Sequence, residues 1–436
     1  NESRFDIVKL QSWQTLFYFF LKKLNFLRPF LGSKGNIVLF REFFFIRETA
    51  VSLIKHGYGF KIIPPLYPSK KDSFGINIKV PGLKKIFNKF LDELLSHLKK
   101  KKKIKNFLYK KYIKKVFYHL EYEKNWRDFI LRQDPRPKAM ITGYPKDYIY
   151  TSINKVAKEF KIPLIILQHG VTPEILDKYF LEHNNALADS CFSNYFFCFN
   201  KGVLNYYGNN FSKSKCVPVG LPQEVSNRTI VKYTKRKSSN LTYIASNHYS
   251  GNINSSVQRG INDFDIALEE IKLANKVFSK LPHKTYFQSY PKAPRYVDPD
   301  PVIERMKKIK NIKILDKNRD LKFLRTIPTI YITKSVSSSM GYLLLSGRPI
   351  VFFNYMSQYV HKDLVNKFRD ILFFFDQKEK NFFQNVRNFL KQPLESIDNE
   401  WNKRSEKRKE FIRNYLGTND GNAGKRVAEF IDQRIN

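Results

Sequence analysis

Short apolar runs alternate with amphipathic stretches along most of this chain. Residues 139–142 and 163–167 are apolar runs next to proline or glycine, and the stretch 148–160 between them carries apolar residues at helical spacing. This pattern predicts two buried strands joined by a helix. Because the turns are tight, the two strands should lie side by side and parallel.

The same alternation recurs on both sides of this unit. In the first half it predicts a helix at 43–55 and strands at 36–40, 60–63, 192–200 and 216–220. In the second half it predicts strands at 241–245, 285–288, 311–315, 329–333 and 350–353, with helices at 264–281, 321–326, 342–346, 381–390, 400–415 and 423–435. The expected fold class is α/β, with two Rossmann-like parallel-sheet domains facing a central cleft.

The chain length supports two domains, because 436 residues are too many for one compact core. We expect an N-terminal domain at 1–227, a polar and basic linker at 228–240, a C-terminal domain at 241–400 and C-terminal helices at 401–436.

A basic helical insertion of two long helices is predicted within the first domain, at about 80–130. Lysines crowd residues 99–115 and are interleaved with aromatic and aliphatic side chains. The insertion is interpreted either as a solvated basic face or as a patch for anionic lipid headgroups or a polyanionic acceptor. The apolar stretch 13–30 also has two interpretations: it is either a membrane-surface helix or a helix packed on the domain.

Composition adds a strong positive charge to this picture. The formal net charge is +39, from 78 Lys and Arg against 39 Asp and Glu, which favours polyanionic partners. Abundant Lys, Asn, Ile, Phe and Tyr also fit an A/T-rich coding bias, which explains part of the excess. Nucleic acid is a disfavoured partner, because no zinc-finger, RNP-type or helix-turn-helix pattern is present.

Cysteine usage and hydropathy bear on the compartment. Three cysteines without metal spacing, Cys191, Cys198 and Cys216, favour reduced thiols in a cytoplasmic protein. No apolar run reaches 18 residues, so we expect no transmembrane helix, and any membrane contact should be peripheral, on the cytoplasmic face.

Two stretches at strand ends carry the candidate chemistry. His169 and Gly170 follow the strand at 163–167, which is where open α/β sheets bind ligands. Ser337, Ser338 and Ser339 lie between the strand at 329–333 and a helix, an arrangement that suits a phosphate group. Both stretches also have an ordinary interpretation, as a polar strand end and as a helix N-cap.

Several well-known kinds of site are excluded because their sequence motifs are absent. The chain contains no P-loop, no G-x-G-x-x-G fingerprint, no His-Glu-x-x-His zinc motif and no G-x-S-x-G elbow. We therefore expect no metal ion and no resident cofactor.

With these elements in place, the chain resembles the two-domain (GT-B) glycosyltransferases of bacterial surface-polymer synthesis. The resemblance rests on His169-Gly170, on Gly220-Leu-Pro-Gln-Glu224 near the domain boundary, on Ser337-Ser338, and on Gly347-Arg-Pro-Ile-Val-Phe-Phe353. Capsule and lipopolysaccharide sugar transferases and CDP-glycerol glycerophosphotransferases are the nearest groups. A His-Pro pair of that family appears here as Tyr290-Pro291, and no acidic residue follows the serine turn.

The resemblance implies roles for particular residues. A donor such as a CMP-, CDP- or UDP-linked sugar would place its phosphates at Ser337 to Ser339. His169, with Glu174, would act as general base on an acceptor hydroxyl. The remaining residues implied for donor binding are Ser246, Asn247, His248, Tyr290 and Lys292.

The resemblance implies a transferase that moves a sugar from a nucleotide-activated donor to a surface polysaccharide or lipid-linked acceptor. Glycerophosphate transfer from a CDP-glycerol-type donor is the alternative within the same fold. A basic binding protein for nucleic acid or membrane, without catalysis, is the alternative from a different class.

Overall fold

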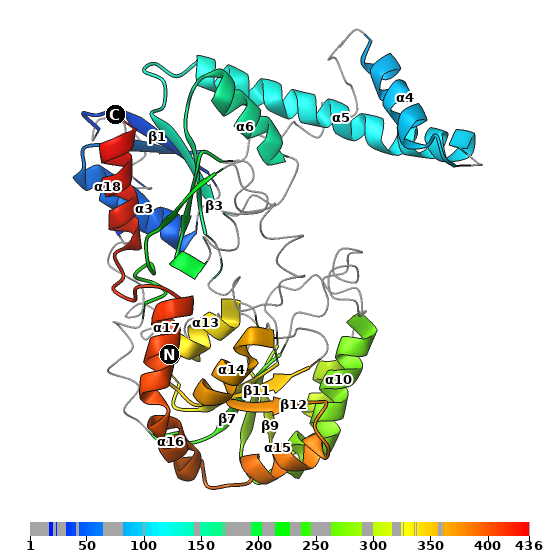
Figure 1. Cartoon of the computed structure of the whole chain (residues 1–436), viewed down its shortest axis with the longest axis vertical. Coiled ribbons are helices and arrows are strands. Elements are labelled where there is room, and N and C mark those ends of the chain that lie inside the picture. Colours follow the sequence, from blue (N-terminus) through cyan, green and yellow to red (C-terminus); the bar gives the residue numbers. More distant parts are fainter. Residues whose placement is uncertain are drawn as a thin grey trace.

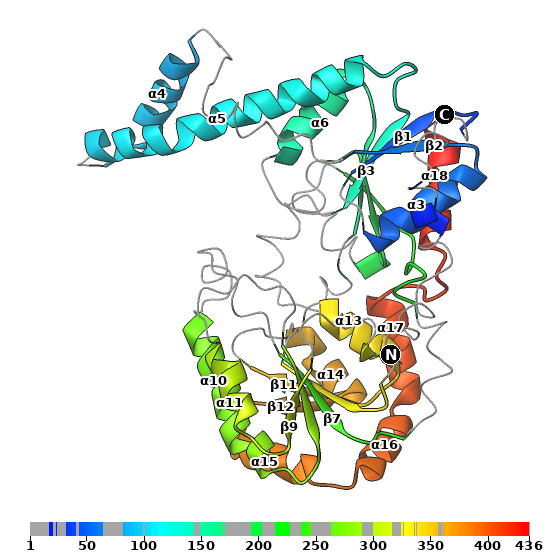
Figure 2. The ribbon, with the colours of Figure 1, turned by 180° about the vertical axis from the view of Figure 1, so that it is seen from behind.

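A computed structural model of the chain gives the architecture. It describes residues 17–20, 23, 32–40, 43–63, 82–98, 101–143, 149–168, 170, 193–202, 214–226, 237–245, 263–289, 300–315, 324–325, 327–334, 336, 338–355, 360 and 362–435. Within these residues the strands form two parallel sheets, each of six strands (Figure 1 and Figure 2). The predicted α/β fold with two Rossmann-like domains is confirmed.

The first sheet has the strand order β2-β1-β3-β4-β5-β6. Its central strands β3 and β4 are short apolar runs buried on both faces, as expected for a parallel sheet covered by helices. The elements of this part are β1 (Asn36–Phe40), α3 (Phe44–Lys55), β2 (Gly59–Ile62), α4 (Leu83–Leu94), α5 (Lys101–Leu131), β3 (Ala139–Gly143), α6 (Ile149–Glu159), β4 (Leu164–Leu167), β5 (Tyr195–Cys198) and β6 (Lys215–Pro218).

The second sheet has the order β12-β11-β10-β7-β8-β9. Its strands are β7 (Leu241–Ile244), β8 (Thr285–Gln288), β9 (Ile312–Ile314), β10 (Ile330–Thr333), β11 (Ile350–Asn354) and β12 (Phe373–Asp376). The helices that follow β7 are α10 (Asp263–Lys276), η3 (Phe278–Lys280), α11 (Pro301–Lys307), α13 (Ser338–Ser346), η4 (Lys362–Leu364), α14 (Val365–Ile371), α15 (Phe382–Leu390), α16 (Leu394–Lys403), α17 (Ser405–Tyr415) and α18 (Ala423–Arg434).

Alternate residues of β1 face two different cores, because successive side chains of a strand point to opposite faces. Val38 and Phe40 pack with Trp126 of α5 in one cluster. Ile37 and Leu39 belong to the larger cluster on the opposite face, which contains residues of α3 and α18 and continues into the second domain.

The C-terminal helix α18 returns to the first domain. Both views place α18 beside α3. A Cβ at Gly424 would lie 2.8 Å from the Glu48 side chain, so only glycine allows this close approach. Phe430 of α18 stacks edge-on against Tyr195 and Phe197 of β5, with ring centroids 5.1 and 5.2 Å apart.

Three helix predictions need correction. The helix expected at 342–346 begins earlier, at Ser338. The helix expected at 400–415 is two helices, α16 and α17, which part at Arg404. Trp401 of α16 and Phe411 of α17 are both buried. The helix expected at 264–281 ends at Lys276 and is followed by η3.

The chain crosses between the domains along two neighbouring segments. The backbone N–H of Leu221, just after β6, donates to the carbonyl of Thr418, between α17 and α18, at 2.8 Å. Pro222 also bridges to Gly421 and Asn422. Most of the linker predicted at 228–240 lies outside the described residues, which resume at Lys237.

Candidate functional site

The strand order of the second sheet identifies where a ligand would bind. From β7 the sheet continues through β8 to β9 at one edge. The next strand in the sequence, β10, lies on the other side of β7, and β11 and β12 continue from it to the opposite edge. The strand order thus reverses between β7 and β10, whose last residues, Ile244 and Thr333, pair with each other. In open α/β sheets, ligands bind beyond the carboxyl ends of the strands at such a point.

Of the three predicted donor stretches of the second domain, residues 246–248 come after β7 and residues 337–339 come after β10 in the sequence, and these are the two strands of the switch point. Ser338 is the first residue of α13, and Ser339 is half-buried with polar interactions of its own. The other predicted site residues lie outside the described residues: His169, Glu174, Ser246, Asn247, His248, Tyr290, Lys292 and Ser337. Their roles stay predictions.

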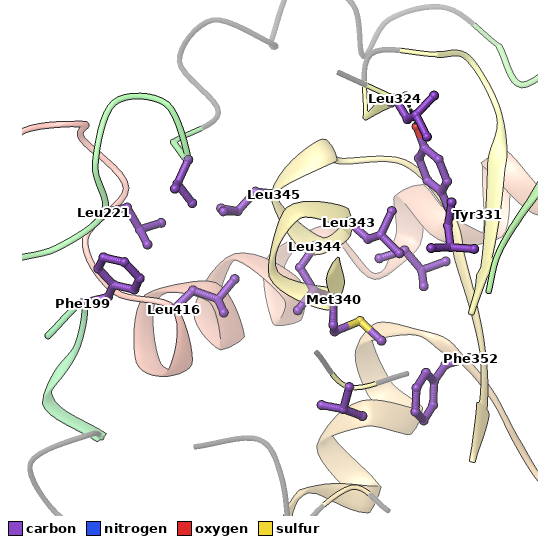
Figure 3. Close-up of a cluster of buried hydrophobic side chains, with 14 of the residues drawn as sticks. Phe199, Leu221, Leu324, Tyr331, Met340, Leu343, Leu344, Leu345, Phe352 and Leu416 are labelled. Atoms are coloured by element: carbon purple, nitrogen blue, oxygen red, sulfur yellow. Dashed lines mark hydrogen bonds between the residues drawn. The ribbon is translucent and has the colours of Figure 1, made fainter. Parts of the chain in front are cut away.

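Helix α13 lies where the two domains meet. Figure 3 shows α13 between Phe199 and Leu221, which follow β5 and β6 of the first sheet, and Tyr331 and Phe352 of the second sheet. All four side chains are buried in one cluster with the leucines of α13. The carboxyl ends of β5 and β6 therefore face the helix that begins just past β10.

Buried polar atoms gather at the carboxyl edge of the second sheet. Gln288 ends β8, Ser289 follows it, and Asn354 ends β11, and each of the three is at most 5% exposed. Gln288 Oε1, Ser289 Oγ and Asn354 Oδ1 have no hydrogen-bond partner among the described residues. Because an unpaired buried polar atom costs free energy, these atoms favour a polar ligand at this edge.

A buried lysine lies next to the serine stretch. Lys334 follows β10 directly and is fully buried. Its Nζ lies 2.8 Å from Glu269 Oε2 and 3.5 Å from Glu270 Oε1, both on α10, and 5.2 Å from the centre of the Tyr355 ring. Tyr243 of β7 donates its hydroxyl to Glu270 Oε2. Burial, and then the charge of Glu270, raise the pKa of Tyr243 well above 10.

This ion-pair cluster joins four elements around the switch point. Lys334 comes from the end of β10, Tyr243 from β7, the two carboxylates from α10 and Tyr355 from the end of β11. The cluster fixes Lys334 at the carboxyl end of β10. Sequence reasoning missed it, although Glu270 interrupts an apolar stripe formed by Ile266, Ala267, Leu273 and Ala274. A carboxylate on a buried helix face requires a partner, and that was the available signal.

In the first sheet, Gln168 fixes the backbone on both sides of residue 169. Its side chain is buried, accepts from the Phe199 N–H at 2.8 Å and donates to the Gly170 carbonyl at 2.6 Å. Gln168 also donates its own N–H to the Phe197 carbonyl at 3.0 Å. Gln168, just after β4, is therefore hydrogen-bonded both to Phe197 of β5 and to Phe199, which follows β5.

The boundary segment Gly220 to Glu224 is held from both domains. Glu48 of α3 accepts the N–H groups of Gln223 and Glu224, both at 2.9 Å. From the second domain, the buried guanidinium of Arg325 donates to the carbonyls of Glu224 and Val225, both at 2.7 Å. The segment is thus held by one acidic side chain from the first domain and one basic side chain from the second.

The acidic side chain that holds this segment makes stability depend on pH. Burial raises the pKa of Glu48 from 4.5 to about 8, against the opposing effect of the two N–H groups. As pH rises past 4.5, unfolded Glu48 ionises while folded Glu48 keeps its proton. The free energy of unfolding should therefore fall from about pH 4.5 to about 8, by at most about 1.4 kcal/mol per pH unit, and level off above.

Urea unfolding over a pH series tests this dependence. The Glu48→Gln variant should lose the decline, whereas Glu410→Gln, on the exposed side of α17, should keep it. Parallel pH profiles for wild type and Glu48→Gln would contradict the assignment.

Metal and membrane-spanning features were also sought in the part of the chain that the structure describes. There, no three histidine, cysteine or acidic side chains come together in a way that would hold a metal ion. None of the helices described has the length and apolar character to cross a bilayer.

Comparison with known proteins gives neither a family nor a curated relative. No protein-family model matches the chain, and no curated protein matches it. Among solved structures, Medicago truncatula UGT71G1 complexed with UDP-glucose is 10% identical, with a TM-score of 0.46 over 92% of this chain and 98% of that one.

Two bacterial structures give similar values. Acinetobacter baumannii MurG is 11% identical, with a TM-score of 0.47 over 92% of this chain and 99% of its own. S. aureus MnaA with UDP is 13% identical, with a TM-score of 0.45 over 92% and 96%. Likenesses of this size establish no activity for this chain, whose fold class rests on its own strand order.

Proposed function

We propose that this protein is a glycosyltransferase that moves a sugar from a nucleotide-activated donor to an acceptor hydroxyl. The observation that carries the proposal is the convergence at the β7–β10 switch point. A serine-rich helix start, a buried ion-pair cluster and unpaired buried polar atoms meet at the edge where a doubly wound sheet takes its ligand. The residues available there suit a phosphorylated, hydroxyl-rich ligand.

Donor phosphates would be bound by the start of α13. Backbone N–H groups at a helix N-terminus are unpaired and carry partial positive charge. Ser337 to Ser339 would add hydroxyl donors, and Ser246, Asn247 and His248 would line the neighbouring strand end. Tyr290 and Lys292, which follow β8, would contact the nucleotide. As transfer proceeds, the helix start would stabilise the charge that grows on the leaving phosphate.

The first domain would supply the base. His169 lies between Gln168 and Gly170, whose positions the Gln168 side chain fixes. A neutral imidazole near pH 7 accepts the proton of an acceptor hydroxyl as that oxygen attacks the anomeric carbon. Glu174 would orient the imidazole or share the proton.

For the acceptor we propose a surface polysaccharide or a lipid-linked precursor, as in capsule or lipopolysaccharide synthesis. A peripheral place on the cytoplasmic face of the membrane fits the net charge of +39. This part of the proposal rests on charge and on the family resemblance.

A thermal-shift panel tests the donor class. A matching nucleotide at about 100 times its Kd should stabilise the protein by about 2.7 kcal/mol. A rise in melting temperature with UDP- or CMP-sugars would support sugar transfer. A rise with CDP-glycerol alone would indicate glycerophosphate transfer instead. No shift with any nucleotide, together with steeply salt-dependent binding to RNA, would overturn the transferase proposal.

A further inference from the structure

Helices α4 and α5 form a hairpin that projects from the first domain. Both overall views show α5 leaving the sheet and α4 lying against its far end. The C-terminal part of α5 is anchored, because Tyr122, Trp126 and Ile130 are buried against the sheet. The N-terminal part of α5 extends beyond the sheet, and α4 packs against it there.

The two helices enclose an apolar groove. Its volume is about 720 Å³, and its walls include Phe87, Phe90, Leu94, Leu108, Tyr112 and Val116. Phe87 packs against Tyr109 across the hairpin, with ring centroids 5.7 Å apart, and Lys105 ties α5 to Asp92 of α4 at 2.6 Å. The groove is thus a built concavity of the size that holds a small ligand.

Large apolar side chains of the hairpin point to solvent. Phe90 and Leu94, which line the groove, are 54 and 58% exposed, and Ile86 and Phe107 on the same two helices are 65 and 62% exposed. Exposed apolar surface at a groove marks an interaction site.

The charges around the groove select the partner. Between Lys101 and Lys115 the chain has eight lysines and no acidic residue. Lys111 lies 5.5 Å from the Phe107 ring centre and Lys115 lies 5.2 Å from that of Tyr112, so cations and aromatic rings occupy the same face. An apolar centre bordered by lysines complements a molecule with a hydrocarbon chain and an anionic head.

We infer that the α4–α5 groove binds the hydrocarbon chain of an anionic phospholipid while the lysines bind its phosphate, so that the hairpin seats the first domain on an anionic bilayer. Nucleic acid would use the lysines but leave Phe90, Leu94 and Phe107 in water. A bilayer interface satisfies both features, because it offers apolar depth and negative surface potential together. The inference deepens the proposed function by naming the surface that brings a lipid-linked acceptor close, and its test does not involve the nucleotide.

Co-sedimentation of the full chain with vesicles tests the inference. Binding to vesicles containing phosphatidylglycerol should exceed binding to pure phosphatidylcholine at least tenfold. Lys110→Gln with Lys111→Gln, and separately Phe90→Ser with Leu94→Ser, should each weaken binding roughly tenfold. Phe264→Ser removes a similarly exposed phenylalanine (70%) from α10 of the second domain and should change nothing.

A second measurement tests whether the hydrocarbon chain of the lipid lies in the groove. A Tyr112→Trp variant puts a reporter in the groove wall, and its fluorescence should be quenched by lipids brominated along the acyl chain. Equal binding to both vesicle types, or wild-type binding by the Phe90→Ser, Leu94→Ser variant, would overturn the inference. So would a dimer seen by light scattering that the same variant dissolves, because the groove would then bind a second copy of the chain. A retained nucleotide-induced melting shift in these variants would show that the failure concerns the groove alone.

Discussion

Replacing Lys334 with methionine should lower the free energy of unfolding by about 3–5 kcal/mol, the cost of removing one partner of a buried ion pair. Lys334 is fully buried, and Glu270, one of its two partners, is fully buried as well. Methionine keeps most of the side-chain volume and removes the charge. The loss should therefore come from carboxylates left without a cation, with Tyr243 still donating to Glu270.

Chemical unfolding followed by tryptophan fluorescence measures this loss. Trp401 of α16 is buried in the second domain, so the transition that it reports should move to a lower denaturant concentration. Lys237→Met is the matched control, because its pair with Glu395 is exposed and should contribute little.

A double variant tests whether the stability lost in Lys334→Met comes from the unpaired charge or from altered packing. Adding Glu270→Gln to Lys334→Met removes the fully buried one of the two uncompensated carboxylates and should recover part of the lost stability. An unshifted second-domain transition in Lys334→Met, or no recovery in the double variant, would count against the ion pair as the cause.

Replacing His169 with alanine should lower kcat for transfer by about 100- to 10,000-fold, the usual contribution of a general base. Nucleotide-induced stabilisation should persist, because the donor is proposed to bind on the other domain. The wild-type rate should fall at acid pH, where the base is protonated, and this acid limb should disappear in the variant.

A transfer assay with the donor found by the thermal-shift panel gives the measurement. His283→Ala is the control, since His283 precedes β8 and lies at the opposite end of that strand from the candidate site. Near-normal transfer by His169→Ala would remove the base assignment while leaving donor binding intact.

Most strands were predictable because they are short segments rich in apolar residues. Strands at 36–40 and 285–288 match β1 and β8 residue for residue, since burial on both faces of a parallel sheet leaves a clear sequence signal. The prediction missed β12, although Phe373 to Phe375 is an equally apolar run. Helix ends were less accurate, as the break at Arg404 shows.

Features that join distant segments were not predictable in the same way. The return of α18 to α3 depends on Gly424 fitting against Glu48, and one glycine carries no such signal by itself. The pairing of Lys334 with α10 likewise depends on the strand order, which sets β7 beside β10. The donor residues Ser246 to His248 and Ser337 to Ser339 were predicted because they follow strands in the sequence, and their roles stay predictions.

A crystal structure of the protein with the nucleotide that most raises its melting temperature tests the central claim most directly. The account predicts the nucleotide phosphates within hydrogen-bond distance of the backbone N–H groups at the start of α13, beyond the carboxyl ends of β7 and β10. A nucleotide bound at the carboxyl edge of the first sheet, or only on the lysines of α5, would contradict it.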